Sequence, residues 1–194
     1  MPLIRATGSR AVATLKTQVV TVGGSVAAFW GVFAANVLSG GLLMQFGVIP
    51  RTLVGLRGIL FAPFIHGSVE HLVSNTVPFL ILGWLVMLRD SRHFMRVTLA
   101  SMLGAGLMAW LIGAPGSVHI GASGVIFGYL GFLMLAGWYE RSFVSIAISV
   151  GVATLWGGLV FGVLPGQPGI SWQGHLGGFL GGVLAARLFS RIRR

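Results

Sequence analysis

The sequence predicts an all-α protein that spans a membrane with six helices. Of its 194 residues, 55% are hydrophobic and 8% are charged, whereas a soluble domain carries roughly 25% charged residues. Mean hydropathy is +0.91, and long apolar stretches recur along most of the chain. Because so few charges cannot cover a surface that faces water, we interpret the chain as an integral membrane protein.

Six stretches have the length of spanning helices, which need about 20 apolar residues. They are predicted at residues 18–41, 66–88, 94–113, 122–139, 143–164 and 174–190. The first follows basic residues that are typical of a signal peptide, but its apolar run is too long for one, so we predict a helix. Segment 42–63 mixes apolar and polar residues, and we expect part of it to lie in the membrane interface.

The positive charges predict how these helices are oriented. With the N-terminus in the cytoplasm, most basic residues fall on the cytoplasmic side, as the positive-inside rule requires. These are Arg5, Arg10, Lys16, Arg89, Arg92, Arg96, Arg141, Arg187, Arg191, Arg193 and Arg194, whereas Arg51 and Arg57 lie in the first outer loop. We predict both termini in the cytoplasm, with a basic segment at 1–17, one membrane domain at 18–190 and a basic tail at 191–194. The net charge of +10 then reflects topology, and nucleic-acid binding is not expected.

Polar residues gather at the outer ends of three predicted helices. The stretch HGSVEHLVSN carries His66, His71 and Asn75, and the last two share a helix face because they are four residues apart. Ser123 opens the fourth helix in GASGV, and His175 opens the sixth in GHLGGFLGG. Ionisable groups at membrane depth are functional candidates by default. The alternative is that they only form hydrogen bonds between helices.

Glycine spacing predicts close packing between the fourth and sixth helices. Small residues four apart let two membrane helices approach closely. The glycines with this spacing are Gly174, Gly177, Gly178, Gly181 and Gly182 in the sixth helix, and Gly124 and Gly128 in the fourth. Such packing would bring Ser123 within reach of His175.

Among the hydrolytic mechanisms considered, the sequence favours a serine–histidine dyad. The zinc-binding motif H-x-x-E-H is absent, because Gly67 occupies the position of its first histidine. The nucleophile-elbow motif G-x-S-x-G is also absent, because Val125 occupies the position of its last glycine. Histidine is the usual base for a serine nucleophile. Of the three acids, Asp90 and Glu140 are predicted on the cytoplasmic side, and Glu70 lies near the second helix. We therefore predict a dyad without a carboxylate and with neither a metal nor another cofactor.

An oxyanion site is also within reach of this dyad. Ser123 is predicted at a helix N-terminus, where backbone N–H groups lack partners and the helix dipole is positive. His71 and Asn75 could add side-chain donors. Ser123, His175, His71 and Asn75 would then each have a role in the reaction.

The three motifs, in this order on the second, fourth and sixth helices, resemble those of the rhomboid intramembrane serine proteases. The family pattern is His-x-x-x-Asn, then Gly-x-Ser-Gly, then a histidine followed by small residues, and the resemblance covers about residues 18–190. It implies a six-helix rhomboid-like bundle. The residues that it implicates are Ser123 as nucleophile, His175 as general base, His71, Asn75 and Gly121 in oxyanion stabilisation, and His66 in a supporting role.

The resemblance also implies a reaction and a location. The protein would hydrolyse peptide bonds in or next to transmembrane segments of other membrane proteins, at a site open to the extracytoplasmic side. We expect a bacterial inner membrane. The fifth helix would be the substrate gate, with Trp156 and Phe161 as candidates for gating or for lipid-facing packing. His119 and Glu70 have no predicted role, although we expect His119 in a loop near the cavity.

The chain departs from the better-known bacterial members of that family, and other functions are open. The first outer loop has no Trp-Arg pair, and neither a cytoplasmic domain before the first helix nor a seventh helix is expected. A non-catalytic binder of membrane helices with the same fold is the main alternative. A small transporter is disfavoured, because the polar residues cluster on one side and form no path across the membrane.

Overall fold

The computed structural model describes residues 13–89 and 91–189, and in these ranges the chain is helical. Extended pairing there is limited to one isolated antiparallel bridge between Val48 and His119. The predicted basic tail and most of the predicted basic N-terminal segment lie outside the described residues. The same holds for Asp90 and for five of the predicted cytoplasmic arginines: Arg5, Arg10, Arg191, Arg193 and Arg194.

All six predicted stretches form helices. The first is helical from residue 13 and passes through a π-helical turn, η1 (Val19–Gly23), into α2 (Gly24–Leu38). The other five are α4 (Val69–Arg89), α5 (Ser91–Ile112), α6 (Ser123–Glu140), α7 (Phe143–Trp156) and α8 (Trp172–Phe189). Within the described ranges, four helices are long and apolar enough to cross a membrane: Ala13–Leu38, Val69–Arg89, Phe94–Ile112 and Phe143–Val163. The chain is therefore a multi-pass helical membrane protein.

The predicted fifth stretch is not one continuous α-helix. Its α-helical part, α7, ends at Trp156, and the chain goes on as the 3₁₀ segment η5 (Gly157–Val163). Three of the seven residues in GGLVFGV are glycines, which have low helix propensity and favour a change of backbone geometry. This change of geometry places the end of η5 beside α8.

The segment before α4 folds as a series of short helical turns. These are η2 (Leu42–Phe46), η3 (Val54–Arg57), α3 (Gly58–Phe61) and η4 (Ala62–Phe64). Several of its large apolar side chains are exposed, among them Leu42, Leu53 and Phe61. Exposed apolar residues on short helices fit an interfacial position, which stays a prediction for this segment.

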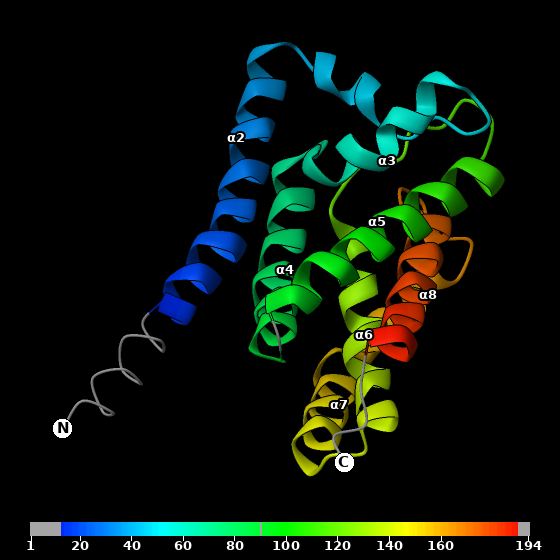
Figure 1. The fold of residues 1–194 in the computed structure, drawn as a ribbon. Helices are drawn as coiled ribbons and strands as arrows, with labels where there is room; N and C mark the ends of the chain where they lie inside the picture. The colour runs from blue at the N-terminus through cyan, green and yellow to red at the C-terminus, as the bar shows by residue number, and fades with distance from the viewer. Residues whose placement is uncertain (1–12, 90, 190–194) are drawn as a thin grey trace.

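The helix α8 packs mainly against α5 and α6, and α6 is the central helix because it also contacts α4 and α7 and is largely buried. Figure 1 shows α2 at one edge of the bundle, and there it contacts α4. The helix α7 packs chiefly against α6 and leaves much of its surface exposed, including Phe143, Val144 and Leu155. The first turns of α6 and α8 lie together near α3.

Glycines set the close approach of α8 to both of its neighbours. A Cβ atom on Gly178 would overlap the carbonyl oxygen of Gly124, and one on Gly182 would overlap that of Gly128. This confirms the predicted packing of the fourth helix against the sixth. Gly177 uses the other face of α8, where a Cβ would overlap the backbone of α5.

Candidate active site

Ser123 and His175 meet at the first turns of α6 and α8. Ser123 is the first residue of α6, and His175 is the fourth residue of α8. The His175 Nε2 atom lies 2.8 Å from the Ser123 Oγ atom, which is hydrogen-bonding distance. The His175 ring also stacks on the ring of Phe127, with centroids 4.0 Å apart and an interplanar angle of 12°. Phe127 is one helical turn after Ser123, so one face of α6 supplies both the hydroxyl and the support for the imidazole.

The second ring nitrogen of His175 is held by a backbone carbonyl. Its Nδ1 atom lies 2.9 Å from the carbonyl oxygen of Gly162, near the end of η5. A carbonyl oxygen only accepts, so Nδ1 must carry the proton and donate it. The lone pair on Nε2 therefore faces the Ser123 hydroxyl, which donates to it. This neutral tautomer is the one that a general base requires.

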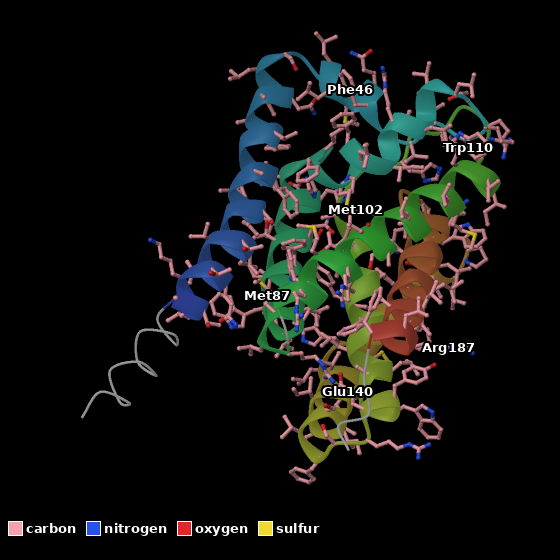
Figure 2. All side chains as sticks on the ribbon, viewed as in Figure 1. Phe46, Met87, Met102, Trp110, Glu140 and Arg187 are labelled. Carbon is pink, nitrogen blue, oxygen red and sulfur yellow. The ribbon has the colours of Figure 1, made fainter. Side chains whose placement is uncertain are left out.

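None of the described carboxylates contacts the dyad. Glu140 pairs with Arg89 and accepts from the Ser145 hydroxyl. Figure 2 shows Glu140 at the end of the bundle opposite Trp110. Glu70 is exposed at the start of α4. In the described part of the chain, the imidazole is thus oriented by an aromatic face and a carbonyl instead of an acid.

His71 and Asn75 face the loop that leads into α6. Gly121 has a φ of +105°, and a Cβ on it would lie 2.5 Å from the His71 Nε2 atom. The Asn75 amide group is buried beside them and donates to the His71 carbonyl at 2.9 Å. Glycine is thus needed at position 121 both for its backbone conformation and for the close approach of His71. The Gly121 N–H already donates to the Ala62 carbonyl at 2.8 Å, so it is not a free donor here.

His66 is fully buried and supports the backbone next to Ser123. Its Nε2 atom accepts from the Ala122 N–H at 3.5 Å, and its ring lies between those of Phe29 and His71. Burial lowers the pKa of His66 to about 4, with a smaller effect from His71, so the ring is neutral at pH 7. His66 therefore contacts the loop rather than the dyad. Among the residues that the structure describes, no three His, Cys, Asp or Glu side chains gather as metal ligands would.

A small cavity of about 40 Å³ lies beside Ser123. It is lined by α3, α5, the loop before α6 and the first turn of α8. His119 and Ser171 are polar residues in its lining, together with Ser123. The rest of the lining is largely small and apolar.

The two predicted gate residues, Trp156 and Phe161, differ in how far they are exposed. Phe161 is 69% exposed on η5, whereas Trp156 at the end of α7 packs against the main hydrophobic core. The structure brings neither to the dyad and instead brings Gly162 there. Sequence reasoning missed Gly162 and Phe127. Phe127 has a signal, because it lies four residues after Ser123 on the same helix face.

The fold and the site together define a multi-pass helical membrane protein with a serine–histidine pair at the ends of two closely packed helices. Residues 54–192 match the Rhomboid domain family, and the chain belongs to this family. Most members are serine proteases that act on transmembrane substrates within the bilayer, but the family also includes inactive members.

Relatives from bacteria and plants are similar to this chain over most of its length. An uncharacterized protein of Mycobacterium tuberculosis, Rv1337, is 43% identical over 165 residues, which cover 81% of this chain and 69% of that protein. RHOMBOID-like protein 5 of Arabidopsis thaliana is 31% identical over 152 residues, covering 72% of this chain and 47% of that protein. RHOMBOID-like protein 4 from the same plant is 30% identical over 134 residues, covering 65% of this chain and 32% of that protein.

Proposed function

We propose that the protein is an intramembrane serine endopeptidase that uses Ser123 and His175 as a catalytic dyad. Its substrates would be membrane proteins, cleaved in or next to a transmembrane segment. The observation that carries this proposal is the 2.8 Å separation between the Ser123 Oγ and His175 Nε2 atoms, with Nδ1 held as a donor. Membership of the rhomboid family supports the substrate class.

In the proposed reaction, the Ser123 oxygen attacks the scissile carbonyl carbon while its proton passes to His175 Nε2. The tetrahedral intermediate collapses, the C–N bond breaks, and the imidazolium gives its proton to the departing amine. Water then attacks the acyl-enzyme, with the same imidazole as base, and Ser123 is regenerated. The Gly162 carbonyl keeps its bond to Nδ1–H throughout and stabilises the imidazolium that forms in each step.

The oxyanion of that intermediate would lie between α4 and the start of α6. As the first residue of α6, Ser123 has an N–H with no acceptor inside its own helix. The side chains of His71 and Asn75 add donors from α4. Because the Gly121 N–H is bound to Ala62, we assign Gly121 the role of letting His71 approach rather than of donating.

We further propose that α6 and α8 also cross the membrane, which gives six crossings with both termini in the cytoplasm. The dyad would then open to the extracytoplasmic side, in a bacterial inner membrane. Substrate would enter between α7 and the rest of the bundle. The exposed surface of α7 and its packing chiefly on α6 support this route.

The test uses purified protein in liposomes with a labelled single-span substrate. We expect cleavage that a metal chelator leaves unchanged, and covalent labelling of Ser123 by a fluorophosphonate probe, located by mass spectrometry. Protein that binds the substrate but neither cleaves it nor reacts with the probe would overturn the proposal in favour of a non-catalytic helix binder. Activity lost on chelation would instead indicate a metal-dependent hydrolase.

Replacing Gly162 by alanine is expected to reduce kcat about 100-fold. The added Cβ would lie 2.8 Å from the Phe127 ring and 3.2 Å from His175 Nδ1, so both the stacking and the carbonyl bond must shift. A displacement of about 1 Å at a catalytic group can cost that much. The rate of fluorophosphonate labelling at Ser123 measures the effect without a substrate.

The matched control is Gly158→Ala in the same 3₁₀ segment, where a Cβ would meet nothing within 4 Å. Both variants replace a glycine of η5 by alanine and so reduce the backbone flexibility of this segment equally. Only the Gly162 variant adds an atom close to the His175 imidazole. Equal activity of the two would show that the Gly162 carbonyl does not orient His175.

A further inference from the structure

His119 has hydrogen-bond partners at both ring nitrogens, although it lies outside the dyad. It stands in the loop between α5 and α6. Its Nδ1 atom lies 2.6 Å from the Ser171 hydroxyl, just before α8, and its Nε2 atom lies 3.0 Å from the Ser117 hydroxyl. Its backbone is fixed as well, because its N–H and C=O both pair with Val48 at 2.9 Å.

The proton positions in this network follow from the number of donors. The single Ser117 hydroxyl proton goes to the Ala114 carbonyl at 2.6 Å, so Ser117 must accept from His119 Nε2–H. In a neutral ring, Nδ1 is then an acceptor and takes the proton of the Ser171 hydroxyl. The Ser171 oxygen in turn accepts from the Gly174 N–H at 3.3 Å. Burial lowers the pKa of His119, which agrees with a neutral ring.

This network lies parallel to the dyad. His119 is four residues before Ser123, and Ser171 is four residues before His175. The His175 N–H donates to the Ser171 carbonyl at 3.0 Å, so Ser171 belongs to the cap of the helix that carries the base. The His119–Ser171 bond therefore joins the same two chain segments as the Ser123–His175 bond, four residues earlier in each segment. Both residues also line the cavity beside Ser123.

We infer that His119 and Ser171 form a positioning pair that sets the separation of the nucleophile and its base. The glycine contacts of Gly178 with Gly124 and of Gly182 with Gly128 hold α6 and α8 together within the helices. The His119–Ser171 bond adds a side-chain contact just before both helices, on the side of the dyad that the paired glycines do not reach. The inference rests on the proposed function, since it concerns the geometry of the same dyad.

The nitrogen responsible can be tested with two substitutions at one position. Asparagine places its amide near the position of Nδ1, and glutamine places its amide near that of Nε2. We expect His119→Asn to retain the bond to Ser171 and most of the activity. We expect His119→Gln to lower kcat and the fluorophosphonate labelling rate about tenfold, with KM unchanged, because the dyad is misaligned while the rest of the site is intact.

Ser171→Ala should behave like His119→Gln, and Ser171→Thr, which keeps the hydroxyl, should restore activity. The matched control is Ser117→Ala, which removes a contact of the same ring on the side away from α8 and is expected to stay within twofold of wild type. Equal kcat and labelling in wild type, His119→Gln and Ser171→Ala would overturn the positioning role. If wild type itself neither cleaves nor labels, the proposed function fails instead, so the two failures are distinguishable.

Discussion

Replacing Ser123 by alanine is expected to lower cleavage of a single-span substrate by about 10⁴- to 10⁶-fold. The loss is large because the hydroxyl oxygen is the atom that forms the acyl-enzyme, the chain has no cysteine, and neither Glu70 nor Glu140 contacts the dyad. His175→Ala should cost a similar factor, since the Ser123 hydroxyl would lose the acceptor 2.8 Å away. Because the two residues act as a unit, the double variant should be no slower than either single variant.

The measurement is single-turnover cleavage in liposomes, with thermal unfolding of each variant in detergent as a check on folding. Ser101→Ala is a suitable control, because Ser101 is a buried serine in α5 whose hydroxyl only donates to the Val97 carbonyl of its own helix. It should keep nearly all activity. Cleavage that survives both Ser123→Ala and His175→Ala would exclude the dyad.

The helices and the meeting of Ser123 with His175 could be predicted because both depend on regular spacing. Apolar stretches of spanning length mark the helices, and glycines four residues apart mark the faces of α6 and α8 that touch. Once these two faces are in contact, residues at the first turns of both helices must be neighbours. The predicted dyad geometry therefore follows from helix periodicity, and the structure places the two side chains at hydrogen-bonding distance.

The groups that orient the imidazole were harder to predict, for two different reasons. The carbonyl of Gly162 is a backbone group, which every residue has, so no residue type marks it. Gly162 lies in the 3₁₀ segment that follows α7, whereas the sequence predicted one continuous helix there. The bond from the Gly121 N–H to Ala62 is likewise a tertiary backbone contact without a pattern in the sequence.

Gly178→Ala is expected to lower both stability and activity. Its Cβ would overlap the Gly124 carbonyl oxygen on the facing helix, so α6 and α8 must move apart. Overpacking of this kind costs about 1–3 kcal/mol in the free energy of unfolding. The residue lies one turn from His175, so a shift of about 1 Å should also slow the reaction about 100-fold.

Two further alanine variants separate these effects. Gly182→Ala makes the same kind of overlap, with Gly128, but lies one turn farther from His175, so it should lose as much stability and less activity. Gly151→Ala lies in α7, where a Cβ meets nothing within 4 Å, and should keep both. If Gly178→Ala and Gly182→Ala lost activity equally, in proportion to their unfolding free energies, the glycines would act on the stability of the bundle alone. A steeper loss of activity at Gly178 would show that close packing of α6 and α8 also positions the base against the nucleophile.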